Sequence, residues 1–141
     1  MTFVLAMVLN PKVMMRAQEE LDCVVGRETL PDFSDKENLP YIDAVVKEVL
    51  RWNPPLPIGL PYRVTQDDVY RGYLIPAGAT VIQNAWAIFR DPNIYHDPET
   101  FNPDRFLKDG KIDQSVYNPE DRVFGAGRRQ EIHFRTSLDG V

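Results

Sequence analysis

Residues 40–52 read PYIDAVVKEVLRW, a stretch bounded by prolines and rich in regularly spaced apolar residues. Its apolar residues are spaced i, i+3, i+4, i+7 and i+8, which predicts an amphipathic helix: Ile42, Val45, Val46, Val49 and Leu50. Pro40 suits the first turn of this helix, and Pro54 ends it. Glu48 and Arg51 lie off the apolar stripe, so their spacing alone indicates a solvated ion pair.

Other elements are predicted on both sides of this helix. Asn10 and Pro11 predict the start of a helix over 11–25, and the apolar residues 1–9 before it are interpreted as the end of a longer buried helix. After the central helix, residues 69–75 and 79–83 predict a hairpin that turns at 76–78. A short helix is expected over 84–89.

Beyond Asp91 the sequence contains Asp-Pro and Asn-Pro turn initiators and many aromatic residues, which predicts an ordered coil with little regular structure. The fold class is therefore mainly α with small β-hairpins. The net charge of −5 argues against a nucleic-acid partner. The longest apolar run, Phe3 to Leu9, has seven residues and is too short to span a bilayer. A single cysteine, Cys23, excludes an internal disulfide framework.

Two further stretches contain charged or glycine-rich motifs. The first is the turn Pro103-Asp104-Arg105-Phe106, and the second is the loop Phe124-Gly125-Ala126-Gly127-Arg128-Arg129. Closely spaced glycines beside arginines indicate a loop that approaches an anion. A nucleotide-binding loop is excluded, because no strand precedes the glycines and no Lys-Ser or Lys-Thr pair follows them.

In combination these motifs resemble the C-terminal third of a cytochrome P450, a haem-thiolate monooxygenase, in its eukaryotic microsomal or fungal form. The resemblance rests on Glu48-x-x-Arg51, Pro98-Glu99-Thr100-Phe101, Pro103-Asp104-Arg105-Phe106 and Phe124-x-x-Gly127-x-Arg129. It implies that residues 1–129 are a partial P450 domain. That domain would contain the end of the long central helix, two further helices, a β-hairpin, the meander coil and a truncated haem loop.

The resemblance also assigns roles to individual residues. Glu48, Arg51 and Arg105 are expected to form a buried charge triad that ties the central helix to the meander. The haem loop would contain Phe124, Gly127 and Arg129, with Arg129 pairing with a haem propionate. Tyr62 and Arg63 stand where many relatives have a second propionate-binding residue. Leu56, Ile58 and Leu60 would line the substrate side of the haem.

By family resemblance the protein is expected to insert one oxygen atom of O2 into a small organic substrate. Its cofactor would be haem, and its electrons would come from NAD(P)H through a reductase. The parent family is expected at the endoplasmic reticulum membrane. Since the chain lacks the family's anchor, we expect the chain itself to be cytoplasmic if expressed.

The family's thiolate cysteine should stand at residue 131, where this sequence has Glu131. No metal ligand is therefore assigned, and Cys23 is interpreted as a small, semi-buried residue of the first helix. We expect the chain alone to be inactive and not to bind haem stably. Residues 130–141 are interpreted as a non-family tail produced by a frame shift or intron read-through. The alternative is a non-catalytic, soluble interaction or structural domain without haem.

Overall fold

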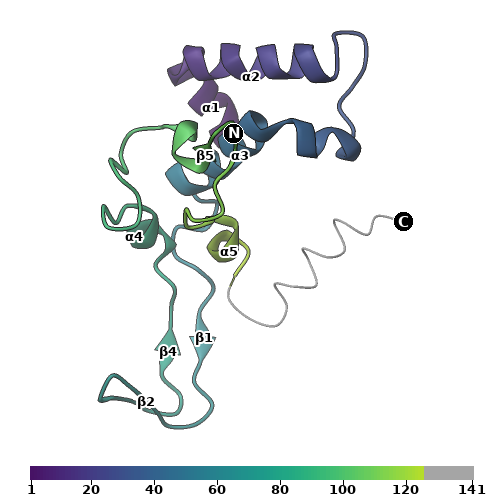
Figure 1. The fold of residues 1–141 in the computed structure, drawn as a ribbon. Helices are drawn as coiled ribbons and strands as arrows, with labels where there is room; N and C mark the ends of the chain where they lie inside the picture. The colour runs from purple at the N-terminus through teal and green to yellow at the C-terminus, as the bar shows by residue number, and fades with distance from the viewer. Residues whose placement is uncertain (126–141) are drawn as a thin grey trace.

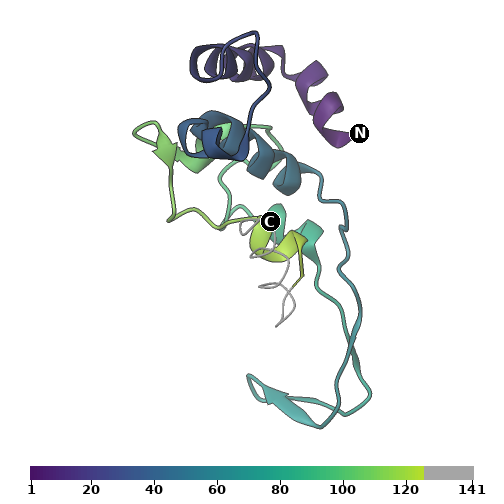
Figure 2. The same cartoon turned by 90° about the vertical axis from the view of Figure 1, so that its right-hand side faces the viewer.

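The computed structural model describes residues 1–125, and helix α3 (Pro40–Trp52) lies at the centre of its helical body (Figures 1 and 2). Helix α2 lies on one side of α3, and helices α4 and α5 lie on the other. Each side has its own apolar cluster. One contains Ala6, Met7, Ala17, Tyr41, Val45 and Phe101. The other contains Ala44, Ala85, Phe89, Tyr95 and Phe106. Both clusters include residues of α3, so this helix joins them.

Helices α1 (Thr2–Leu9) and α2 (Pro11–Val24) meet at Asn10. Asn10 is the residue before α2, as predicted, but its side chain does not cap that helix. Its Nδ2 instead donates to the carbonyl of Ala6 at 2.9 Å, which satisfies one of the free carbonyls at the end of α1. After α2 the chain turns at Gly26, whose φ of +86° lies in the left-handed region that ends many helices.

Within residues 1–125 only Ala6 and Met7 of α1 are buried, whereas most of its apolar side chains are exposed: Phe3, Val4, Leu5, Val8 and Leu9. One expectation for this part of the chain is wrong. Cys23 was expected to be semi-buried and is exposed.

A β arm extends from the helical body (Figure 1). Strand β1 (Tyr62–Arg63) pairs antiparallel with β4 (Thr80–Val81). Further out, β2 (Asp68–Tyr70) pairs with β3 (Tyr73–Ile75). The prediction of one strand over 69–75 is wrong, because the run folds back on itself at Arg71 and Gly72. Both residues have positive φ, 51° and 83°, as the favoured two-residue hairpin turn requires.

The predicted short helix is present as α4 (Ala85–Phe89), and the side chain of Asn84 caps it by accepting from the amide of Ala87. The coil that follows is ordered by burial of aromatic side chains, as the sequence predicts: Tyr95, Phe101 and Phe106 are buried beside Phe89 of α4 or in the cluster around Tyr41. Four short elements interrupt it, namely η2 (Pro103–Phe106), β5 (Leu107–Lys108), β6 (Lys111–Ile112) and α5 (Glu120–Val123).

Several elements were not predicted, among them η1 (Phe33–Asn38) and the β5–β6 hairpin. The 3-10 helix η1 precedes α3, and its first residue is capped by Asp32. The β5–β6 hairpin turns at Asp109 and Gly110, which have φ of 52° and 75°. An Asp-Gly pair is a strong hairpin signal, so this turn was readable from the sequence. Across residues 1–125, no helix combines the length and apolarity needed to cross a membrane.

Candidate functional site

The centre of the site is a pair of fully buried side chains on α3, Glu48 and Arg51, each 0% exposed. The guanidinium of Arg51 binds the carboxylate with two parallel hydrogen bonds, from Nε to Oε2 at 2.7 Å and from Nη2 to Oε1 at 2.8 Å. This bidentate arrangement matches the planar fork of arginine to the two carboxylate oxygens. The solvated pair indicated by the helical wheel is therefore absent, because coil residues cover this face of α3.

The remaining donors of Arg51 bind the backbone of the coil. Nη1 donates to the carbonyls of Phe89 at 3.0 Å and Pro98 at 2.8 Å, and Nη2 donates to the carbonyl of Thr100 at 3.4 Å. Together with the two bonds to Glu48, each of the five N–H groups of this guanidinium has an acceptor. A buried cation with every donor satisfied avoids most of the penalty of leaving water.

Arg105 of η2 binds the same carboxylate from the other side. Its Nε lies 3.1 Å from Oε2 and 3.3 Å from Oε1 of Glu48. Its other nitrogens donate to the carbonyls of His96, Asp97 and Thr100. The amide of Asn102 adds a further bond to Glu48 Oε1 at 2.8 Å. The structure thus brings together the three residues that the resemblance grouped, and Glu48 joins α3 to the coil.

This network has one more positive than negative charge, and carbonyl dipoles of the coil offset the excess. Asp97 helps to aim them, because its backbone has a φ of +48°, a left-handed conformation that aspartate tolerates better than most residues. The ring of Tyr95 lies against the network, with the guanidinium carbon of Arg51 5.5 Å from its centroid. Burial raises the pKa of Tyr95, whose hydroxyl donates to the carbonyl of Tyr117 at 2.8 Å.

A further buried charge, that of Lys47, was not predicted from the sequence. Its side chain is 9% exposed, and its ammonium lies 3.2 Å from Glu120 Oε2 and 3.7 Å from Asp43 Oδ2. Asn118 Oδ1 is also within reach, at 3.5 Å. A lysine next to Glu48 reads as one more solvated charge, so only the fold of the coil reveals this role. Lys47 connects α3 to α5, the element that precedes Phe124.

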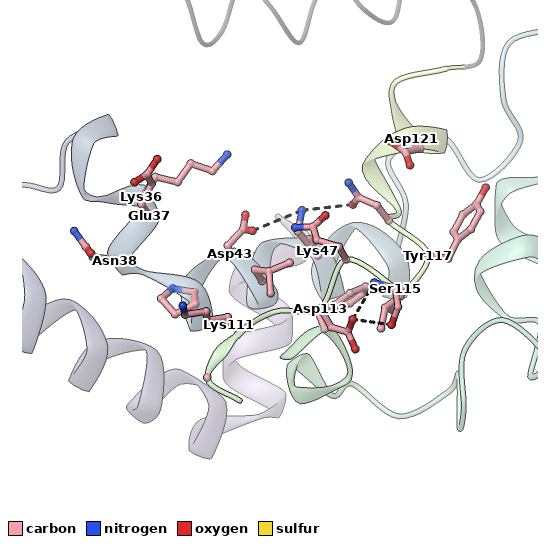
Figure 3. Close-up of a pocket in the computed structure, with 17 residues that line it drawn as sticks. Lys36, Glu37, Asn38, Asp43, Lys47, Lys111, Asp113, Ser115, Tyr117 and Asp121 are labelled. Atoms are coloured by element: carbon pink, nitrogen blue, oxygen red, sulfur yellow. Dashed lines mark hydrogen bonds and ion pairs between the residues drawn. The ribbon is translucent and has the colours of Figure 1, made fainter. Parts of the chain in front are cut away.

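Lys47 lies at the wall of an open groove of about 1110 Å³ between η1, α3 and the coil (Figure 3). Polar side chains and charged side chains of both signs line this groove, among them Lys36, Asp43, Lys111 and Asp113. Hydrogen bonds from Ser115 lower the pKa of Asp113. Charges of both signs are thus present along this groove, and Lys47 and Asp43 form an ion pair in its wall.

The structure separates the two residues at the expected propionate position. Tyr62 and Arg63 are neighbours on β1, so their side chains point to opposite faces of the strand. The hydroxyl of Tyr62 lies 3.6 Å from the place where a Cβ on Gly125 would be. A guanidinium nitrogen of Arg63 lies 3.8 Å from the corresponding place on Gly78, at the turn of the β arm. Tyr62 is thus the one of the two that meets the start of the glycine-rich loop.

The expected substrate-side residues Leu56, Ile58 and Leu60 are 48%, 63% and 65% exposed. Phe124 is also exposed, at 58%. The segment that contains the three aliphatic residues lies between α3 and β1, so the charge network and the apolar edge are joined by a few residues of backbone.

The other expected cofactor residues, Gly127 and Arg129, lie outside the described residues, as does Glu131. Within residues 1–125, His, Cys, Asp and Glu side chains form no cluster of three suited to a metal ion. Cys23 lies on α2, which Figures 1 and 2 place on the opposite side of α3 from α5.

Comparison with known proteins gives consistent matches. A family model described as cytochrome P450 matches residues 1–130. A cytochrome P450 monooxygenase of Armillaria gallica is 55% identical over 129 residues, covering 91% of this chain and 25% of the relative. Another, of Postia placenta, is 48% identical over 128 residues, with 91% and 25% covered. A third, of Coprinopsis cinerea, is 48% identical over 126 residues, with 89% and 24% covered. The chain spans about a quarter of the length of these relatives.

Proposed function

The chain belongs to the cytochrome P450 family, and we propose that it is part of a haem-dependent monooxygenase. The whole protein would insert one oxygen atom of O2 into a small organic substrate, with electrons delivered from NAD(P)H by a reductase. The observation that supports this most directly is the buried carboxylate of Glu48 between Arg51 and Arg105, within a chain so similar to P450 monooxygenases.

The described residues fit only the edge of a haem site. Tyr62 offers a polar hydroxyl beside Gly125, and Leu56, Ile58 and Leu60 offer an exposed apolar surface. Bound haem in this family supplies the oxidising power for the reaction. An axial thiolate, which favours cleavage of the O–O bond, would have to come from a cysteine. The chain has Glu131 at the matching position and Cys23 on α2.

We therefore propose that these 141 residues have no monooxygenase activity alone and do not hold haem stably. A carboxylate cannot donate electron density to iron as a thiolate does. Phe124, Gly127 and Arg129 would still form the glycine-rich loop beside the cofactor, with Arg129 suited to a propionate. The contribution of the chain's own core is to position that loop and the segment from Leu56 to Leu60.

The proposed partners follow from the family, which generally uses a reductase and organic substrates. We propose the same partners for the whole protein, at the endoplasmic reticulum membrane. No nucleic acid is proposed as a partner, because the net charge of −5 would oppose binding to phosphates.

A second candidate function is a non-catalytic interaction or structural domain without haem, and the glutamate at position 131 favours it. The exposed apolar side chains of α1 and of the segment from Leu56 to Leu60 argue against it. Such surfaces on an independent domain promote aggregation unless another part of a protein covers them.

Two experiments on the 141-residue chain test these proposals. One is a titration with haemin, followed in the Soret region, and the other is a thermal melt. The proposed function expects weak uptake of haemin and no O2-dependent product when NADPH and a P450 reductase are added. Turnover of any organic substrate by the chain alone would overturn the proposed inactivity. If the chain binds no haemin and unfolds cooperatively, the result would support the interaction domain instead.

A further inference from the structure

The backbone from Trp52 to Leu60 is held at three points by one other stretch of chain, residues 83–90. The amide of Gly59 donates to the carbonyl of Gln83 at 2.8 Å. The amide of Trp86 donates to the carbonyl of Pro57 at 2.9 Å. Arg90 Nη2 donates to the carbonyl of Trp52 at 3.1 Å. Two of these bonds are backbone contacts, and the third depends on one side chain.

The side chain of Arg90 is held in an unusual way. Its guanidinium carbon lies 3.2 Å from the ring centroid of Trp86, a close stack of cation on aromatic face. Its Nε lies 3.4 Å from Glu99 Oε1, and its side chain is 18% exposed. Its Nη1 is buried and has no hydrogen-bond partner among residues 1–125. The stack on Trp86 is therefore favoured over complete hydrogen bonding of the guanidinium.

The spacing between the two stretches allows little adjustment. A Cβ on Gly59 would lie 3.2 Å from the carbonyl oxygen of Gln83 and 3.3 Å from its Cβ, so the backbones approach too closely for a larger residue without movement. Pro54, Pro55 and Pro57 make the intervening segment stiff. A stiff segment that is anchored at both ends moves as a unit when one anchor is released.

We propose that Arg90 is a positioning residue for the substrate-side edge of this protein. By stacking on Trp86 while it holds the carbonyl of Trp52, Arg90 locks α4 to the end of α3 and sets where Leu56, Ile58 and Leu60 lie. The assignment of these three residues to the substrate side rests on the proposed function. The mechanical role of Arg90 stands on the contacts alone.

Amide hydrogen exchange of the 141-residue chain tests this role residue by residue. In Arg90→Met, loss of the stack and of the bond to Trp52 should speed exchange at the Gly59 and Trp86 amides by about tenfold, while amides within α3 change by less than about twofold. Arg90→Lys retains the positive charge and can still donate to the carbonyl of Trp52, but it lacks the planar guanidinium that stacks on Trp86. It should give an intermediate acceleration at the same two amides.

The matched control is Arg71→Met. Arg71 also lies near an aromatic ring, with its guanidinium carbon 5.4 Å from the centroid of Tyr70. Arg71 is, however, in the two-residue turn between β2 and β3. Its substitution should leave exchange at Gly59 and Trp86 unchanged. If Arg90→Met does not fold, the pattern in Arg90→Lys decides.

The proposal is overturned if the Gly59 and Trp86 amides keep their native exchange rates, or if α3 amides accelerate to the same extent, since Arg90 would then stabilise the whole body. Haemin plays no part in this measurement. A failure of the chain to bind haem would therefore leave the outcome for Arg90 unaffected.

Discussion

Glu48 and Arg51 form a bidentate ion pair within one turn of α3, and both side chains are completely buried. Such a pair contributes little by itself, because the cost of removing both charges from water offsets their attraction. What makes it a structural centre is the second set of contacts, from Arg105 and from coil carbonyls that approach from outside the helix. Removal of any one of Glu48, Arg51 and Arg105 would therefore leave the remaining buried charges without full compensation.

Replacing Glu48 by Gln should destabilise the protein by about 3–5 kcal/mol, because the guanidinium groups of Arg51 and Arg105 would remain in the interior without a carboxylate. Urea denaturation followed by circular dichroism measures the change. Asp22→Asn is the matched control, since Asp22 pairs with Arg27 at 2.9 Å on the surface and both side chains are exposed. The control should change stability by about 1 kcal/mol or less. Equal losses in the two variants would contradict the network.

Arg51→Lys retains the positive charge and tests geometry alone. An ammonium has three donors and no planar fork, so at least two of the five acceptors now bound by Arg51 would lose their bond. We expect a loss of about 2–4 kcal/mol in the free energy of unfolding. Arg27→Lys, at the exposed pair, should be close to neutral. Wild-type stability in Arg51→Lys would show that charge alone is sufficient.

The extent of α3 could be predicted from the sequence, whereas its buried face could not. Proline at both ends and the apolar spacing define a helix over 40–52, as observed. The apolar spacing, however, does not predict correctly which side chains of α3 are buried: Val46 is 42% exposed, whereas Glu48 and Arg51 are 0% exposed. Periodicity reports which face prefers to leave water. It does not report that a distant coil will supply carbonyls and a second arginine.

Lys47→Met tests the second link between α3 and the coil. The substitution retains the apolar stem but leaves the carboxylates of Asp43 and Glu120 without their shared cation. We expect a loss of about 1–3 kcal/mol and faster hydrogen exchange in α5, the element that precedes Phe124. Lys36→Met, an exposed lysine at the same groove, is the control and should leave α5 unchanged. Unchanged exchange in α5 of Lys47→Met would refute the link.

Tyr95 should make stability sensitive to alkaline pH. Burial raises the pKa of its hydroxyl above the ordinary value of 10.0, so the folded state retains the proton where the unfolded chain releases it. The resulting stability is fully present below the unfolded pKa and is lost as pH rises above about 10. Tyr95→Phe removes this dependence and, through loss of the bond to Tyr117, costs about 1 kcal/mol at neutral pH.

Denaturation midpoints at about pH 8 and about pH 11 provide the comparison. The difference between the two midpoints should be smaller in Tyr95→Phe than in the parent. Tyr73→Phe, at a residue that is 77% exposed, should retain the parent's difference. If the denaturation midpoint of Tyr95→Phe falls between the two pH values by as much as that of the parent, a group other than Tyr95 causes the loss of stability at alkaline pH.

The candidate site could be predicted in part, on a different ground from α3. The family resemblance grouped Glu48, Arg51 and Arg105, which the structure places in contact, but it could not choose between Tyr62 and Arg63. That choice depends on which face of β1 meets Gly125, a consequence of pairing with β4. The hairpin turn at Arg71 and Gly72 was not predicted, because the residues on both sides of it favour strands and the whole run therefore reads as one strand.

The reduced carbon monoxide spectrum decides whether this chain, which has the buried charge network described above, provides a thiolate ligand to haem. The chain is mixed with haemin, reduced under carbon monoxide and compared with Cys23→Ala. We expect that neither protein shows the red-shifted Soret band of a thiolate-ligated haem, after which the family is named. A band of that type in the parent chain would contradict the account, and its loss in Cys23→Ala would identify Cys23 as the ligand.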